Sequence, residues 1–561
     1  MFTAGLTAPV RLRKKCGEQY WGIPPNPPGK YLPNETSFPT GKVYLQSADQ
    51  DVYKPRGETP ENRVFKYALA QPREPTSPMT TSTINFTPKG LYIGGQWSPS
   101  ASGQTLTSRN PATGEVLGEV PLANEEDVDR AVAAAKIAFT QWRNVPAAER
   151  AKCLEQLADR IVENTEELAL MDAYDSGNAL AGMRGDVKIS ADSLRYFAAM
   201  IREVKGETLI NGPRHLNFTM RQPFGVVAKI NPFNHPFRFC ADKVAAPLAA
   251  GNCVVVKQPE QAPLSGLRFG ELCDGIFPAG VVNVITGDAV AGSALVRHPD
   301  VHRIAFIGSV ETGRIIAKEA AEGLKQVSLE LGGKNPIIIF PDADPQRAAK
   351  MAIKGMNMNR QGQSCSSTSR VFVHQSIHDE VTGHLVAEAE KLPVGFPWLE
   401  EYEVGPIVSQ EQYDRVMGYI ASGKEAGAQL LTGGGKPAGE MYDNGFFVSP
   451  TVFDGVQPHM RIAREEIFGP VMSVFTWDDY EAMIGHVNEL MYGLTAAIVT
   501  NDLAQAMETA QRVEAGYVWI NTNGRYLGAP YGGWKQSGIG QEECFEELLS
   551  YTQIKNVNMG W

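Results

Sequence analysis

The sequence is poor in cysteine and has no long hydrophobic run. Seven cysteines are spread over 561 residues without a CxxC pair, at positions 16, 153, 240, 253, 273, 365 and 544. This spacing argues against a zinc site and favours a reducing compartment, so no metal is predicted. Apolar stretches such as residues 254–256 and 336–340 have strand length, far below the ~20 residues that span a bilayer. We therefore predict no transmembrane segment.

Long basic runs are also missing after residue 80, and the net charge of the chain is −11. Proteins that bind nucleic acid carry clustered basic residues, so neither nucleic acid nor a membrane is an expected partner. A chain of this length with 43% hydrophobic and 20% charged residues is an ordinary globular protein of two or more domains. The composition favours a small-molecule partner and a cytoplasmic location.

The first part of the chain differs from the rest. Residues 1–78 hold 12 of the 37 prolines and carry 11 basic against 7 acidic residues. Pro-rich, aperiodic sequence rarely packs a core, so residues 1–85 are predicted to be a disordered extension. Its basic start vaguely resembles a mitochondrial transit peptide, but four prolines between residues 24 and 28 would break an amphipathic helix. Import is thus the alternative location, and we hypothesise that the functional polypeptide begins near Met79.

Predicted strands and helices alternate beyond residue 86. Asn124 can cap a helix whose apolar residues fall on one face. Strands are expected in two series, at residues 225–230, 253–257, 281–285 and 303–307, and then at 336–340, 370–373, 471–475, 496–500 and 517–521. Strands that alternate with helices imply a parallel sheet. The fold prediction is therefore α/β, with two doubly wound domains.

Cys365, Glu330 and Asn234 form the minimum set for thioester chemistry on a carbonyl. Cys365 lies in a small, polar segment, where a thiolate could be approached closely. Glu330 ends an apolar strand before two glycines, and partial burial would suit it to accept a proton from water. Asn234 lies between two prolines that would hold its amide rigidly toward an oxyanion. Each has an ordinary alternative: a loop cysteine, a salt bridge of Glu330 with Lys334, or an Asx turn at Asn234.

The usual dinucleotide and nucleotide fingerprints, GxGxxG after a first strand and GxxxxGK[ST], are not found. Instead, the strand at 303–307 runs into Gly308 and Ser309, a strand-to-helix turn whose amides could meet a pyrophosphate. Lys257 and Glu260 follow another strand and are spaced to face an adenosine ribose, where Glu260 would disfavour a 2′-phosphate. Taken singly, these features are weak indications of a dinucleotide.

Taken together, the motifs resemble the NAD(P)-dependent aldehyde dehydrogenase superfamily, of the non-acylating, hydrolytic type. The similarity covers roughly residues 86–561, and the motifs stand in the family's order at residues 231–236, 257–260, 306–313, 329–334, 361–365, 465–470 and 530–538. The resemblance implies that a Cys365 thiolate attacks an aldehyde and that the Asn234 amide and the Cys365 N–H hold the oxyanion. Hydride transfer would leave a thioester, which Glu330 would hydrolyse through an activated water.

The same resemblance implies the cofactor, the domains and the assembly. NAD is favoured by Glu260, with NADP possible, and the cofactor contacts expected are Ile230, Pro232, Lys257, Glu260, Gly308, Ser309, Glu466 and Phe468. Residues 86–206 and 224–333 would form a Rossmann-like NAD-binding domain, and residues 334–547 a catalytic domain. Residues 207–223 and 548–561 would form a small β oligomerisation element of a homodimer or homotetramer.

Departures from the family pattern concern the substrate. Arg360 stands where the family often has Asn, and Gln541 where it often has Arg. The substrate tunnel is expected at His235, Phe239, Asp242 and Tyr531. His235 could relay protons, line the tunnel or stabilise a turn, and Asp242 could face a polar or cationic aldehyde or pair with Arg238. The aromatic side chains would suit a benzaldehyde-like substrate or an ammonium group.

Two other functions remain open at this point. A thiol esterase would use Cys365 without a cofactor, but it leaves Glu330 and the Lys257/Glu260 pair unexplained. A catalytically silent scaffold would keep the fold, although no lesion at the three catalytic positions supports it. Cofactor-dependent oxidation of an aldehyde is therefore the predicted function.

Overall fold

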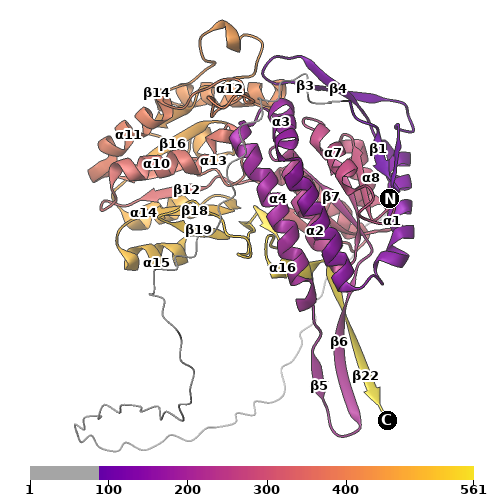
Figure 1. Ribbon diagram of the computed structural model, residues 1–561. Coiled ribbons are helices and arrows are strands. Elements are labelled where there is room, and N and C mark those ends of the chain that lie inside the picture. Colours follow the sequence, from indigo (N-terminus) through magenta and orange to yellow (C-terminus); the bar gives the residue numbers. More distant parts are fainter. Residues whose placement is uncertain (1–86) are drawn as a thin grey trace, which may run out of the picture. The chain divides into compact units, whose positions relative to one another are not determined.

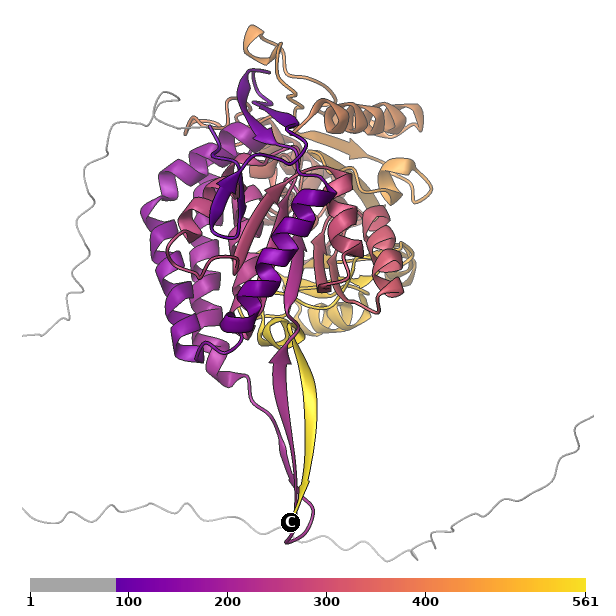
Figure 2. The same ribbon diagram turned by 90° about the vertical axis from the view of Figure 1, so that its right-hand side faces the viewer.

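Two sheets organise residues 87–561, which are the residues that the computed structural model describes (Figures 1 and 2). The predicted extension at residues 1–85 and the proposed start near Met79 lie outside the described residues. No helix within residues 87–561 is long and apolar enough to cross a bilayer.

The first sheet has eight strands and a parallel centre. In spatial order they are β2 (Gln96–Ser98), β1 (Leu91–Ile93), β9 (Val282–Thr286), β8 (Cys253–Gln258), β7 (Val226–Ile230), β10 (Val301–Ile307), β11 (Gln326–Glu330) and β21 (Gly538–Ile539). The five strands from β9 to β11 are parallel, whereas β1, β2 and β21 pair antiparallel at the edges. From β7 the chain winds outward to β9 and then returns to β10, so the order reverses between β7 and β10.

Helices cover both faces of this sheet. One face packs against α1 (Glu125–Trp142), α8 (Ala289–Arg297) and α9 (Val310–Glu322). The other packs against α5 (Pro236–Ala241), α6 (Ala245–Ala250) and α7 (Leu264–Cys273), with α2 (Ala147–Glu163), α3 (Thr165–Ser176) and α4 (Leu180–Met200) outside them. The predicted cap of α1 is confirmed: Asn124 Oδ1 accepts from Asp127 N at 3.1 Å, and Asp127 Oδ2 accepts from Asn124 N at 3.0 Å.

The second sheet has seven strands, of which all but β14 run parallel. Their order is β14 (Gln429–Thr432), β15 (Thr451–Asp454), β16 (Val471–Trp477), β13 (Arg370–His374), β12 (Pro336–Ile339), β18 (Thr495–Val499) and β19 (Tyr517–Ile520). Ile338 faces the core with α12 (Gln410–Glu425) and α14 (Tyr480–Asn488), whereas Ile337 and Ile339 face α10 (Pro345–Gly355) and α11 (His378–Glu390). The predicted pair of doubly wound α/β sheets is confirmed.

A three-stranded sheet forms an arm that extends away from both larger sheets (Figure 1). It pairs β6 (His215–Pro223) with β22 (Thr552–Gly560) along their whole length and adds β5 (Thr208–Ile210). Leu209, Ile210 and Ile554 are exposed on it, at 64%, 77% and 62%. The other strands and α-helices are β3 (Thr105–Arg109), β4 (Val116–Pro121), β17 (Tyr492–Gly493), β20 (Trp534–Lys535), α13 (Arg461–Arg464), α15 (Leu503–Arg512) and α16 (Phe545–Ser550).

Candidate active site

The loops that follow β7, β10 and β11 meet at the carboxyl edge of the first sheet. Ile230 is in register with Phe306 on β10, and Ile307 with Glu330 on β11, so these three strands end together. Ligands of open α/β sheets bind at this edge where the strand order reverses. A cavity of about 160 Å³ lies here, and it is lined by Pro232, Phe233, Asn234, Ile307, Gly308, Ser309, Glu330, Gly332, Cys365, Gln412, Arg415, Glu466 and Phe468.

Cys365 reaches this cavity from the loop before β13. Two left-handed residues, Gln361 (φ 52°) and Gly362 (φ 67°), turn the chain, and a Cβ at Gly362 would lie 2.3 Å from a backbone oxygen. The Cys365 carbonyl accepts from Asn335 Nδ2 at 2.7 Å. Burial and then the charge of Glu330 raise the pKa of the thiol well above its usual value, while the Arg525 guanidinium acts to lower it. The free thiol is therefore neutral, and an additional positive charge or hydrogen-bond donor is needed to favour the thiolate.

Glu330 is only 5% exposed, and its Oε1 has no hydrogen-bond partner among the described residues. Burial and then the charge of Glu542 raise its pKa to about 8. The alternative salt bridge with Lys334 is not formed within residues 87–561, since the buried Lys334 Nζ has no partner there. Glu330 is thus a carboxyl that can exchange a proton near neutral pH.

Asn234 is 3% exposed and lies in the turn between β7 and α5. Its carbonyl oxygen accepts from Asn178 Nδ2 at 3.0 Å, and its side-chain Oδ1 has no partner among the described residues. The following helix is held by Phe237 N, which donates to Asp172 Oδ2 at 3.1 Å. The backbone of the turn is therefore held in place, and Asn234 lines the same cavity as Cys365.

Gly308 and Ser309 form the turn into α9 on another wall of the cavity. Gly308 N donates to the Glu330 carbonyl at 3.0 Å, and a Cβ at Gly308 would lie 2.4 Å from the Phe306 ring. Ser309 Oγ accepts from Thr312 N at 3.2 Å and so caps the helix. The positive end of a 13-residue helix thus faces the cavity.

Glu466 and Phe468 close the cavity from the second sheet. Glu466 Oε1 accepts from Gly333 N at 2.9 Å, and burial raises its pKa to about 7. A Cβ at Gly332 would lie 2.1 Å from Glu466 Oε2, so a side chain at this position would displace the carboxylate. Phe468, at φ 58°, meets the Phe233 ring edge-on at 5.7 Å.

The structure places the other predicted cofactor contacts beside the cavity and not in its wall. Ile230 is in register with Lys257 on β8, so both lie at the same sheet edge. Lys257 Nζ lies 3.3 Å from Glu260 Oε2. Of the predicted cofactor contacts, Pro232, Gly308, Ser309, Glu466 and Phe468 are brought together with Cys365.

The predicted tunnel residues are held by hydrogen bonds, one ion pair and ring contacts. His235 Nδ1 lies 2.6 Å from Asp186 Oδ2, and burial lowers the pKa of His235 to about 4, so the imidazole is neutral. Arg360 donates to Asp186 Oδ1 at 2.5 Å. Burial acts to raise the pKa of Asp186, but the Arg360 guanidinium holds it well below its usual range. Arg360, a departure from the family pattern, therefore has a structural partner.

Asp242 is 3% exposed and accepts from Arg238 Nε at 3.0 Å, which is the ion-pair alternative stated for it. Tyr531 Oη lies 3.8 Å from Cys365 Sγ. The Phe239 ring lies 4.9 Å from the His235 ring. Of the predicted tunnel residues, Tyr531 is thus the one with a contact to Cys365 among the described residues.

Several residues near the site were not predicted. Gln412 and Arg415 line the cavity, where Gln412 Nε2 donates to the carbonyl oxygen of Phe468 at 2.9 Å. Lys243 Nζ lies 2.9 Å from Glu542 Oε2, and Arg525 Nη2 lies 2.7 Å from Glu543 Oε1. Lys243 and Glu542 are about 300 positions apart in the sequence, and Arg525 and Glu543 lie in loops without periodicity. The spacing of residues in the sequence therefore could not predict these two pairs.

Comparison with known proteins gives consistent relatives. The aldehyde dehydrogenase family model matches residues 97–557. The aldehyde dehydrogenase tropH of Talaromyces stipitatus is 46% identical over 478 residues, which cover 84% of this chain and 93% of that protein. The hydroxyisobutyraldehyde dehydrogenase of Mycolicibacterium austroafricanum is 43% identical over 480 residues, covering 85% and 95%. The solved NAD⁺ complex of an aldehyde dehydrogenase from Bacillus cereus has a TM-score of 0.82 and 40% identity, with 84% and 96% covered.

Proposed function

The chain belongs to the aldehyde dehydrogenase family and is an NAD-dependent enzyme that oxidises aldehydes, and we propose that Cys365, Glu330 and Asn234 carry out the reaction. The observation that carries this proposal is their convergence on one cavity with Glu466 and the N-terminus of α9. The product would be the free carboxylic acid.

The residues present fit NAD. Gly308 and Ser309 would hold the pyrophosphate at the N-terminus of α9, and Lys257 and Glu260 the adenosine ribose. Gly332 leaves room for the Glu466 carboxylate, which would hold the nicotinamide ribose. When bound, NAD supplies the hydride acceptor.

In the first step the Cys365 sulfur would form a bond to the aldehyde carbon after losing its proton. Arg525 favours the thiolate by its charge, against the effects of burial and of Glu330. The carbonyl oxygen would become an oxyanion, which the Asn234 amide and the Cys365 N–H would stabilise. Loss of hydride from the same carbon would leave a thioester on Cys365.

In the second step Glu330 would take a proton from water, whose oxygen attacks the thioester carbon. The carbon–sulfur bond breaks, and the acid leaves from a regenerated thiolate. A pKa of about 8 suits Glu330 to this role, because the carboxylate is present at mildly alkaline pH and is a stronger base than an ordinary one.

The proposal extends to the domains and the assembly. The first sheet would bind NAD, the second would supply Cys365, and the arm would join subunits of a homodimer or homotetramer. The exposed Leu209, Ile210 and Ile554 on the arm support an interface. Light scattering of an Ile210→Asp, Ile554→Asp variant would show a smaller particle than the native chain, and an unchanged mass would refute this assignment.

The experiment that tests the reaction is NADH formation by the purified protein across neutral and charged aldehydes. Activity that requires both NAD and Cys365, shown by its loss in Cys365→Ala, would support the proposal. Ester cleavage without cofactor that also requires Cys365, in the absence of any aldehyde oxidation, would favour the esterase alternative.

A further inference from the structure

Asp186 is a fully buried carboxylate on α4 that contacts residues of two loops at the site. Its Oδ2 lies 2.6 Å from Nδ1 of His235, the residue after Asn234. Its Oδ1 accepts from Arg360 Nη2 at 2.5 Å, and Arg360 stands on the same loop as Cys365. One carboxylate therefore connects the turn that carries the Asn234 amide with the loop that carries the cysteine.

The side chains of Asp186, His235 and Arg360 are in mutual contact, since Arg360 Nε also lies 3.2 Å from His235 Nδ1. Burial acts to raise the pKa of Asp186 but Arg360 holds it low, and burial lowers the pKa of His235 to about 4. Asp186 is therefore a carboxylate and His235 a neutral imidazole whose Nδ1 hydrogen can be donated to it. Breaking such a pair would leave an uncompensated charge in the interior, so the cluster resists rearrangement.

The connection between α3 and α4 holds the same two loops through the backbone. Asn178 Nδ2 donates to the Asn234 carbonyl at 3.0 Å. The next residue, Ala179, donates its N–H to the carbonyl of Asn359 at 3.0 Å. The beginning of α4 and the residues before it are thus a common support for the Asn234 turn and for the loop that leads to the cysteine.

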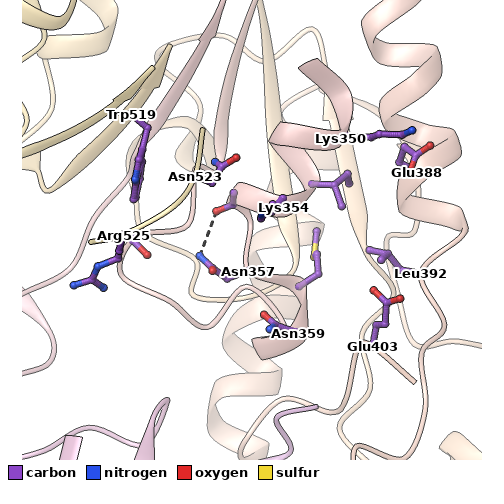
Figure 3. Close-up of a pocket in the computed structure, with 14 residues that line it drawn as sticks. Lys350, Lys354, Asn357, Asn359, Glu388, Leu392, Glu403, Trp519, Asn523 and Arg525 are labelled. Atoms are coloured by element: carbon purple, nitrogen blue, oxygen red, sulfur yellow. Dashed lines mark hydrogen bonds between the residues drawn. The ribbon is translucent and has the colours of Figure 1, made fainter. Parts of the chain in front are cut away.

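Part of the cysteine loop borders a cavity of about 420 Å³, which is lined by residues 357–359 and Ser366 among others. Figure 3 shows Asn357 and Asn359 beside this cavity, where Asn357 Nδ2 donates to the carbonyl of Gly355 at 3.3 Å. This bond is local and does not fix the loop relative to Asn234. A segment that borders a cavity is held less by packing, so its polar contacts with α4 matter more for its position.

We propose that Arg360 and Asp186 are positioning residues, which hold the cysteine loop and the Asn234 turn at the separation that the oxyanion requires. This inference rests on the proposed function. Neither residue lines the cavity that Cys365 and Asn234 share, so both act through the two loops and not by touching the substrate. Donors of an oxyanion hole stabilise the developing charge only when they are held in place before the reaction.

The test is a double-mutant cycle on the single-turnover rate of NADH formation, with NAD and the neutral aldehyde propanal. Arg360→Gln and Asp186→Asn should each lower this rate about 10- to 100-fold, since a donor displaced by about 1 Å loses this much. In an Asn234→Ala background the same changes should cost less than about twofold more, because no amide remains to be positioned. Arg360→Lys keeps the charge and should restore part of the rate.

Two controls separate positioning from general damage. Arg184→Gln changes another arginine of α4, which pairs with Glu166 and Glu400 away from the two loops, and should leave the rate unchanged. Alkylation of Cys365 by iodoacetamide forms no oxyanion, so Arg360→Gln should alkylate at the wild-type rate.

Losses of equal size with and without Asn234 would overturn the inference, since Arg360 and Asp186 would then support the fold and not the amide. Alkylation slowed as much as NADH formation would overturn it too, because the cysteine itself would be affected. If Arg360→Gln fails to fold, Asp186→Asn, which keeps the side-chain volume, carries the cycle. An Asn234→Ala variant as fast as the wild type would instead count against the proposed function, and the inference would fall with it.

Discussion

The phenolic oxygen of Tyr531 lies 3.8 Å from the sulfur of Cys365. Burial raises the pKa of both groups well above their usual values, so Tyr531 is a neutral hydroxyl that can donate to the thiolate. We expect Tyr531→Phe to raise the pKa of Cys365 further and to slow its alkylation by iodoacetamide about 2- to 10-fold, the loss of one hydrogen bond. Tyr526→Phe is the control, because Tyr526 is 69% exposed. Equal alkylation rates in both variants would show that Tyr531 does not stabilise the thiolate.

Removing the base should separate the two halves of the reaction. Glu330→Gln is expected to form about one NADH per active site and then to stall, with steady-state turnover at least 100-fold lower. Rapid-mixing absorbance would measure the burst, and Glu508→Gln, an exposed change on α15, serves as the control. Loss of the burst together with turnover would mean that Glu330 acts before the thioester forms.

The pH dependence of thioester hydrolysis should report Glu330. Its pKa of about 8 means that the carboxylate, the basic form, increases as pH rises through that value. The hydrolysis rate, measured in a single turnover, should therefore rise through about pH 8 and level off above it. Glu542 is ionised, since Lys243 holds its pKa low against the effect of burial, and its charge raises the pKa of Glu330.

Glu542→Gln removes that charge, so the midpoint of the hydrolysis profile should move to lower pH. Glu546→Gln is the matched control, because Glu546 is exposed and its charge is screened by solvent. A midpoint that is the same in Glu542→Gln as in the wild type would contradict the assignment of this titration to Glu330.

Much of the fold followed from periodicity and composition. The two series of buried strands alternate with helices, and this local pattern is enough to predict parallel sheets. It could not predict the strand order or the antiparallel edge strand β21. The association of β6 with β22, which joins residues far apart in the chain, was implied only by the family resemblance. Such pairings depend on tertiary packing, which local sequence patterns do not predict.

The residues of the site likewise fall into those that the sequence predicted and those that it did not. The structure brings Cys365, Glu330, Asn234 and Glu466 to one cavity. Each of these residues lies at the end of a strand or in a motif whose chemical role the sequence predicts. Arg525 carries no such signal, since its partners Glu543 and Tyr531 become neighbours only when the loop after β19 folds back. The role of His235 stayed ambiguous because its charged neighbour Asp186 depends on how α4 packs against α5. The partner of Asp242, by contrast, is Arg238, four residues earlier, which was one of the two alternatives stated for it.

Asp172 accepts a hydrogen bond from the helix that follows the Asn234 loop, and it makes the stability of the fold depend on pH. Burial and, to a smaller extent, the charges of Asp186 and Asp175 raise its pKa to about 8. In the unfolded chain its pKa is near 3.9, so between about pH 4 and 8 the folded state binds one more proton at this position. Stability must therefore fall as pH rises through this window, by about 1.4 kcal/mol per pH unit from this group alone.

Asp172→Asn removes this titration and keeps an oxygen that can accept from Phe237 N. The melting temperature of the variant should consequently fall less than that of the wild type between pH 6 and 8. Asp159→Asn is the control, since Asp159 is an exposed carboxylate paired with Arg195. If the melting temperatures of the wild type and of Asp172→Asn fell in parallel, Asp172 would be ionised in the folded protein. Its carboxylate would then be stabilised by more than the single hydrogen bond from Phe237.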